Sequence, residues 1–80
     1  MPTINMAATG QNINTLRKAA GMTVHDLQLQ MGFNTPQAIF KWFRGDALPT
    51  IDNLVILAAL FGVTLDDLVV VDRKTNGVCA

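Results

Sequence analysis

The chain has 80 residues, half of them apolar and 15% charged, and its six basic and six acidic side chains cancel to a formal charge of zero. This length allows one domain, and the apolar content excludes an intrinsically disordered chain. The single cysteine, Cys79, excludes an internal disulfide and every zinc site built on cysteine pairs. The sequence contains no apolar stretch of about 20 residues, which predicts a cytoplasmic protein with no membrane partner.

The charges are unevenly distributed along the chain. Residues 1–45 carry four basic side chains and one acidic side chain, a net charge of +3. Residues 46–80 carry two basic and five acidic side chains, a net charge of −3. This asymmetry allows one part of the surface to face an anionic partner although the whole chain is neutral.

The first helix is predicted to begin at Thr9, because a threonine side chain accepts a hydrogen bond from a free amide at a helix start. Gly21 suits the left-handed position that follows the last turn of a helix. Residues 1–8 are therefore expected to form a flexible N-terminal arm. The domain is expected to span residues 9–71, followed by a C-terminal tail over residues 72–80.

The second and third helices are predicted to be short and separated by a tight turn. Thr23 is expected to open the second helix, with Asp26 placed three residues later to complete a capping box. Thr35 is expected to cap the third helix, with Pro36 at its first position, where the missing amide proton costs no hydrogen bond. A glycine follows each helix and indicates its end.

Two further helices are predicted in the second half of the chain. Thr50 caps the fourth, whose body over residues 54–61 is apolar on every side, so it requires neighbours all round or a face shared with another chain. Thr64, with Asp67, opens a short fifth helix. These patterns predict an all-α fold, a compact five-helix bundle. The apolar excess predicts a homodimer through the fourth and fifth helices or the valines after them.

The third helix, over about residues 36–44, has two different faces. Its inward stripe contains Ala38, Ile39, Trp42 and Phe43, and its outward stripe contains Gln37, Phe40, Lys41 and Arg44. A glutamine amide pairs with adenine, cations suit guanine edges or phosphates, and an apolar ring suits thymine methyl groups. A short helix that presents such side chains after a helix and a tight turn is typical of proteins that read the DNA major groove.

Residues from about Asn12 to Val70 resemble the Cro- and lambda-repressor-like, or XRE-type, helix-turn-helix domain. The matching segments in chain order are LRKAAGMTVHDL, MGF, AIFKWFRG and LPTIDNLVILAALFGVTLDDL. The resemblance implies a lambda-repressor-like bundle that binds double-stranded DNA and acts as a sequence-specific transcriptional regulator, a repressor. The chain departs from the family pattern at Val24, where a phosphate-contacting glutamine is usual, and at Phe43, where an acidic residue is common.

The resemblance also implies which side chains contact DNA. The candidate DNA-binding residues are Asn34, Thr35, Gln37, Phe40, Lys41 and Arg44. Gln37 and Lys41 stand where the family reads base edges. The family contacts the DNA backbone or flanking bases at the positions of Asn34, Thr35 and Arg44. For Phe40 three roles are open: a DNA contact, packing against the neighbouring Gln37 and Lys41 stems, and contact with a partner protein.

Arg17 and Lys18 are expected on the outer side of the first helix, either as plain surface residues or as phosphate contacts. An interaction module or antitoxin-like protein on the same fold, without DNA binding, is the alternative. The neutral overall charge, Val24 and an exposed Phe40 favour it. An enzyme is not expected, because a chain without Glu or Tyr and with one His and one Cys cannot assemble a nucleophile, a base and an orienting group. No catalytic residue, cofactor, metal or small-molecule substrate is predicted.

Overall fold

The computed structural model describes residues 3–72, which form five helices and two short strands. The helices are α1 (Met6–Ala19), α2 (Val24–Met31), α3 (Gln37–Arg44), α4 (Ile51–Phe61) and α5 (Leu65–Leu68). The strands β1 (Thr3–Ile4) and β2 (Val71–Asp72) pair antiparallel, with Ile4 opposite Val71. The predicted five-helix architecture is confirmed. None of the helices between residues 3 and 72 is both long and apolar enough to cross a bilayer.

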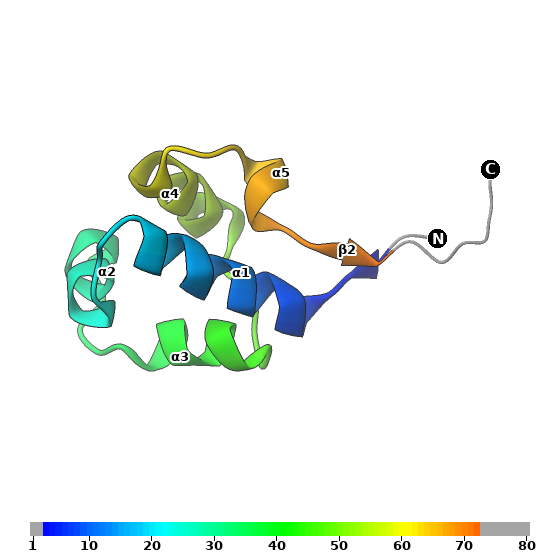
Figure 1. The fold of residues 1–80 in the computed structure, drawn as a ribbon. Helices are drawn as coiled ribbons and strands as arrows, with labels where there is room; N and C mark the ends of the chain where they lie inside the picture. The colour runs from blue at the N-terminus through cyan, green and yellow to red at the C-terminus, as the bar shows by residue number, and fades with distance from the viewer. Residues whose placement is uncertain (1–2, 73–80) are drawn as a thin grey trace.

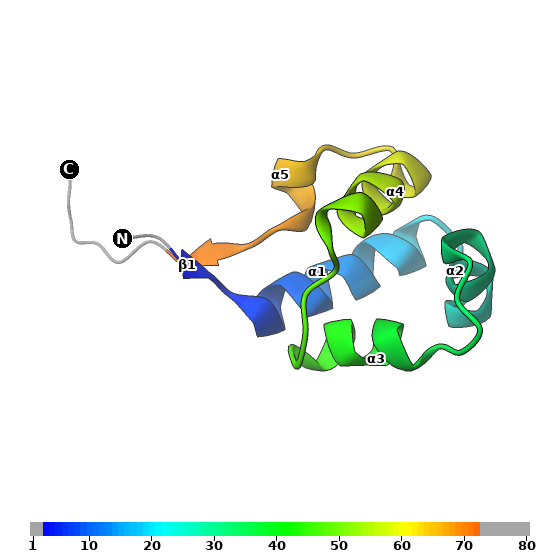
Figure 2. The ribbon, with the colours of Figure 1, turned by 180° about the vertical axis from the view of Figure 1, so that it is seen from behind.

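Helix α1 runs through the middle of the molecule (Figures 1 and 2). Helix α3 lies on one side of it, α4 and α5 lie on the other, and α2 closes the end away from the strands. The backbones of α1 and α3 touch at Gly10, where an added Cβ would overlap the Trp42 carbonyl oxygen and lie 3.1 Å from the Cα of Phe43. This direct backbone contact fixes the distance between α1 and α3.

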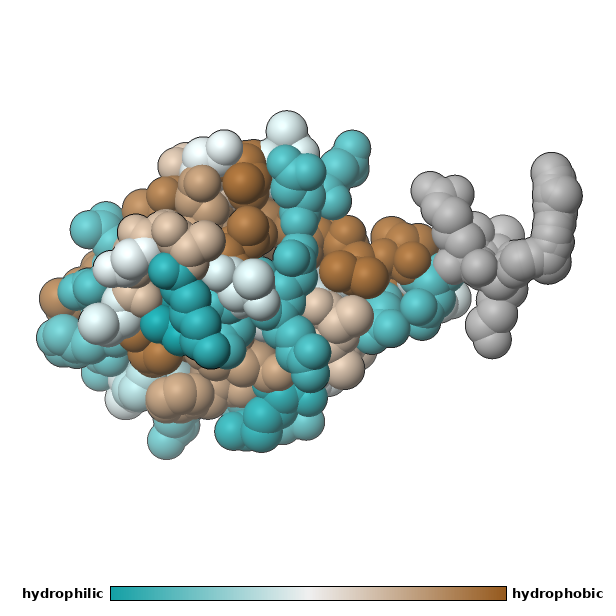
Figure 3. Space-filling model, viewed as in Figure 1, coloured by the Kyte–Doolittle hydropathy of each residue, from teal (hydrophilic) through white to brown (hydrophobic). Residues whose placement is uncertain are grey.

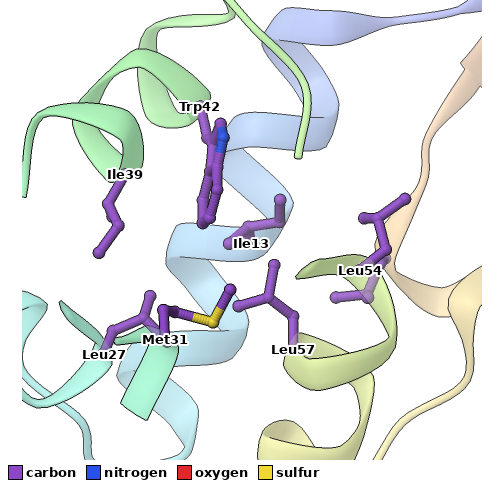
Figure 4. Close-up of a cluster of buried hydrophobic side chains, with 8 residues drawn as sticks. Ile13, Leu27, Met31, Ile39, Trp42, Leu54 and Leu57 are labelled. Carbon is purple, nitrogen blue, oxygen red and sulfur yellow. The ribbon is translucent and has the colours of Figure 1, made fainter. Parts of the chain in front are cut away.

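The core consists of eight buried apolar side chains, and every helix contributes at least one. They are Ile13, Leu27, Met31, Ile39, Trp42, Leu54, Leu57 and Leu68. Figure 4 shows seven of them labelled, with Ile13 of α1 among side chains from α2, α3 and α4. Their removal from water is the main force that holds the helices together.

The N-cap of α1 lies four residues before Thr9, the cap predicted from the sequence. Asn5 is its N-cap, and the side chain of Asn5 accepts a hydrogen bond from the amide of Ala8 at 2.9 Å. Asparagine caps helices as well as threonine does, so the local pattern offered two starts. The prediction that Thr9 caps the helix was wrong, and the expected arm over residues 1–8 was wrong for residues 3–8.

The side chain of Thr9 is used elsewhere, in binding the segment that follows α5. Its hydroxyl accepts a hydrogen bond from the Val70 amide at 2.9 Å, and Thr9 is fully buried. Asn12 donates to the Leu68 carbonyl at 3.0 Å, and Asn5 donates to the Asp72 carboxylate at 3.2 Å. One stripe of α1 thus holds the end of the described chain in place, and Asp72 belongs to the fold. The rest of the expected tail, including Cys79, lies outside the described residues.

The capping boxes predicted at α2 and α5 are confirmed, as is the cap of α4 by Thr50. At α2 the Thr23 hydroxyl accepts from the Asp26 amide at 3.0 Å, and the Asp26 carboxylate accepts from the Thr23 amide at 3.0 Å. The backbone hydrogen bond from Thr23, followed by its side chain, lowers the pKa of Asp26 below its ordinary value of 3.8.

Replacing Asp26 by asparagine is expected to remove a pH-dependent part of the stability. Since the pKa of Asp26 is lowered by folding, its carboxylate stabilises the fold above pH 3.8, and this stabilisation is lost as the pH falls below that value. Urea unfolding between neutral and acidic pH should show the free-energy difference between wild type and Asp26→Asn shrinking toward low pH. Asp66→Asn is the control, because Asp66 takes no part in a capping box. A difference that stays constant with pH would contradict the prediction.

Candidate nucleic-acid interface

Helix α3 is anchored by one face and exposes the other. Ile39 is fully buried and Trp42 is 4% exposed, whereas Gln37 and Lys41, which lie one turn apart, are both exposed. The helix ends at Gly45, which adopts the left-handed conformation with φ of 79°. The outward orientation of Gln37 and Lys41 expected from helical spacing is therefore present.

All six candidate DNA-binding side chains belong to exposed residues. Asn34 and Thr35 lie in the turn before α3, and the rest lie on α3 itself: Gln37, Phe40, Lys41 and Arg44. The six residues thus occupy one continuous stretch of surface along the α2–α3 connection and the outer side of α3. Its cations are Lys41 and Arg44, both in the last turn of the helix.

The start of α3 differs from the prediction that Thr35 caps it. Pro36 occupies the N-cap position with φ of −85° and ψ of 6°, and no side chain accepts a hydrogen bond there. The hydrocarbon ring of proline carries no hydrogen-bond acceptor, so Pro36 cannot cap the free amides. The amides of the first turn of α3 are consequently free of side-chain caps, unlike those of α2.

Arg44 forms an ion pair at the end of α3. Its Nε lies 2.8 Å from Oδ2 of Asp46, and both side chains are more than half exposed. Asp46 is itself held by its backbone amide, which donates to the Lys41 carbonyl at 2.9 Å. It is the only ion pair within 4.0 Å among residues 3–72. No carboxylate in this range therefore contacts Lys41 and offsets its positive charge.

Phe40 is 42% exposed, but its ring is not isolated. It meets the Phe43 ring edge to face, with the ring centroids 6.3 Å apart and the planes at 78°. The ring therefore packs against Phe43, an aromatic neighbour one turn along the helix. The sequence had suggested packing against the aliphatic parts of Gln37 and Lys41, and this contact with Phe43 was not expected.

The environment of Arg17 differs from the one expected from the sequence. It was expected on the outer surface of α1, but it is half-buried, donates hydrogen bonds to Asn14 and Met22, and lies over the Phe43 ring. Helical spacing marks it as a neighbour of Asn14 but gives no sign of Phe43, which is far away in sequence.

Among residues 3–72 no group of three His, Cys, Asp or Glu side chains is placed to hold a metal ion.

Known proteins resemble this chain in both sequence and fold. A 26 kDa repressor protein of Escherichia phage HK022 is 38% identical over 48 residues, which cover 56% of this chain and 20% of the phage protein. The chain therefore matches about a fifth of the length of that relative.

Two solved structures share the fold. The restriction-modification controller protein C.AhdI from Aeromonas hydrophila superimposes with a TM-score of 0.70 at 22% identity, covering 80% of this chain and 96% of that one. The BldD DNA-binding domain of S. venezulae superimposes with a TM-score of 0.65 at 22% identity, covering 79% and 93%.

The family model described as Helix-turn-helix (HTH_3) matches residues 13–68. This range contains the second half of α1 and the whole of α2 to α5, including the exposed side of α3. Because the match covers well over half of the chain, the chain belongs to the XRE-type helix-turn-helix family of DNA-binding proteins.

Proposed function

We propose that the chain is a sequence-specific transcriptional regulator, a repressor, that acts on DNA in the cytoplasm and reads the major groove with α3. One observation carries the proposal: Ile39 and Trp42 anchor α3 in the core, which leaves Gln37 and Lys41 exposed on the same short helix. Such a helix can enter a groove without unpacking the domain. The phage repressor relative supports a role in repression.

Each exposed side chain has a role in this proposal. Gln37 pairs with an adenine edge, and Lys41 binds a guanine edge or a phosphate. Arg44, with Asn34 and Thr35 of the turn, holds the DNA backbone, together with the uncapped amides at the start of α3. Phe40 contacts a thymine methyl group or a sugar, because its exposed ring is apolar.

Selection of bound duplexes from a random pool tests the proposal directly. A regulator of this kind is expected to enrich one sequence motif, and its affinity for the enriched duplex should fall steeply with salt. With about four to six phosphate contacts per monomer, the log–log slope should be roughly −4 to −5 for a bound monomer and about twice that for a bound dimer. If no duplex is retained even at about 50 mM salt, DNA binding is excluded.

Replacing Asp46 by asparagine is expected to strengthen DNA binding. The change removes a negative charge beside α3 and frees the Arg44 guanidinium, which Asp46 contacts at 2.8 Å. Affinity for the enriched duplex should rise by about three- to tenfold at low salt and return toward the wild-type value as salt increases. Fluorescence anisotropy titrations measure this effect, and Asp52→Asn on α4 is the control. Unchanged or weaker binding would show that Arg44 does not contact DNA.

We further propose that the protein is a homodimer joined through an apolar surface on α4, α5 and the paired strands. We call this the α4–strand surface; its exposed members are Ile4, Ile51, Val55, Ile56, Leu65 and Val71. Ile4, Ile51, Leu65 and Val71 line one hollow, so these four side chains lie side by side. Figure 3 shows hydrophobic residues over the α4–α5 end of the molecule and along the strands. A small domain rarely leaves so many large aliphatic side chains in water without a partner.

Replacing Ile51 by aspartate is expected to separate the dimer without harming the fold. Ile51 is 70% exposed and is the first residue of α4, where a negative charge is favourable. Sedimentation equilibrium should give twice the monomer mass for the wild type, and self-association at least about tenfold weaker for Ile51→Asp. Leu29→Asp is the matched control, since Leu29 is 62% exposed on α2, outside the α4–strand surface. Equal effects of the two changes would contradict this interface.

A protein-interaction module on the same fold is the second candidate. The exposed ring of Phe40 and the size of the α4–strand surface favour it, because both offer apolar area to a protein partner. The duplex selection separates the two functions. An enriched motif whose half-sites repeat at about one helical turn would support the dimeric regulator, and a pool without enrichment would support the module.

A further inference from the structure

Arg17 joins the end of α1 to the α1–α2 turn. Its Nε and Nη2 both donate to Oδ1 of Asn14, at 3.0 and 2.7 Å, and its Nη1 donates to the Met22 carbonyl at 2.7 Å. Three hydrogen bonds from the planar guanidinium fix its orientation. These acceptors are neutral, so they do not offset the positive charge of the guanidinium.

The same guanidinium reaches α3 through an aromatic side chain. Its central carbon lies 5.8 Å from the centre of the Phe43 ring, a distance at which a cation is attracted to an aromatic face. Phe43 in turn meets Phe40 edge to face at 6.3 Å. A continuous series of contacts therefore runs from the α1–α2 turn, through Arg17 and Phe43, to the exposed side of α3.

This arrangement restricts the ways in which Arg17 could contact a phosphate. A guanidinium has five N–H groups, and three of the donations from Arg17 already go to Asn14 and Met22. The two N–H groups that remain, one on each terminal nitrogen, are the only donors that a phosphate could use without breaking these bonds. The ring of Phe43 also covers one side of the group.

We propose that Arg17 is a positioning residue for DNA recognition: it holds Phe43, and through it Phe40 and the outer side of α3, in the orientation that reads bases. The inference rests on the proposed DNA-binding function of α3. Arg17 acts on sequence discrimination without touching DNA, which separates it from Lys41 and Arg44.

Two substitutions at Arg17 distinguish positioning from phosphate contact. Arg17→Lys keeps the charge but loses the planar fork, and Arg17→Met loses both. Binding is measured with the duplex enriched by the wild type and with a shuffled duplex of the same composition, at a temperature where circular dichroism shows each variant folded. Positioning predicts that both variants bind the enriched duplex about tenfold more weakly, with unchanged affinity for the shuffled duplex and an unchanged salt slope.

Two results would overturn the inference. If Arg17→Met alone loses affinity and its salt slope falls by about 0.9, Arg17 contacts a phosphate. If the ratio between enriched and shuffled duplex is unchanged in both variants, Arg17 has a merely structural role. Phe43→Leu, which leaves the three Arg17 hydrogen bonds in place, should lower the same ratio, and adding Arg17→Lys to it should lower the ratio no further.

Hydrogen exchange on the free protein keeps this test independent of the proposed function. Arg17→Lys and Phe43→Leu are expected to speed exchange of the amides between Phe40 and Arg44 while leaving those of α4 unchanged. If the wild type retains no duplex, the proposed function fails, and exchange alone then decides whether Arg17 orders α3. Unchanged exchange in α3 would overturn the positioning role.

Discussion

Gly10→Ala is expected to destabilise the domain by at least about 3 kcal/mol, although alanine is the better helix former by about 1 kcal/mol. The added methyl group would overlap the Trp42 carbonyl oxygen and lie 2.7 Å from the carbonyl carbon. These are backbone atoms of a helix anchored by Ile39 and Trp42, so they cannot turn aside as a side chain can. A domain of this size has a total stability of roughly 4–12 kcal/mol, so the loss is a large fraction of it.

Thermal unfolding followed by circular dichroism measures this effect. The midpoint should fall by about 15 °C or more, or the transition should disappear. Gly21→Ala is the matched control, because Gly21 has a positive φ of 72° but no atom within 4 Å of an added Cβ. It should cost only about 1–2 kcal/mol for the left-handed backbone. A Gly10→Ala protein as stable as the wild type would show that α1 and α3 can move apart.

Lys41→Ala is expected to weaken binding to the enriched duplex by about ten- to a hundredfold and to reduce the magnitude of the salt slope by about 0.9 for each bound subunit. Lys41 is exposed in the last turn of α3, and no carboxylate within residues 3–72 pairs with it. Its loss therefore removes a whole positive charge from the proposed interface. Anisotropy titrations at several salt concentrations give both quantities.

Two other substitutions make the result interpretable. Lys18→Ala removes the same charge from an exposed residue of α1 and should leave the affinity within about twofold of the wild type. Gln37→Ala should leave the salt slope unchanged but relax the preference at one base pair by roughly 1–3 kcal/mol. If Lys18→Ala and Lys41→Ala weaken binding equally, α3 does not form the DNA-binding surface.

Local sequence determined much of the fold and part of the candidate site. The capping boxes at Thr23 and Thr64 were predictable because each hydrogen bond spans three residues. The separation of α3 into a buried and an exposed face was predictable because helical periodicity alone puts Gln37 and Lys41 opposite Ile39. In each case the partners are near neighbours in the chain, so the pattern is visible without the fold.

Tertiary structure decided the contacts that join distant segments. Thr9 looked like a helix cap, but its hydroxyl binds Val70, 61 residues away. Arg17 looked like a surface cation, but the fold places Phe43 beneath it. The contact of Gly10 with the backbone of α3 likewise joins two distant segments, and no local pattern indicates it.

The physical reason for this division is the range of the interactions. Capping and helical periodicity depend on hydrogen bonds and side-chain directions within one or two turns, which neighbouring residues specify. The closeness of α1 and α3 and the pairing of the two strands depend on how five helices bury one shared core. The sequence alone therefore determined which side chains α3 turns outward, whereas the packing of α1 against it determined how firmly and at what angle they are held.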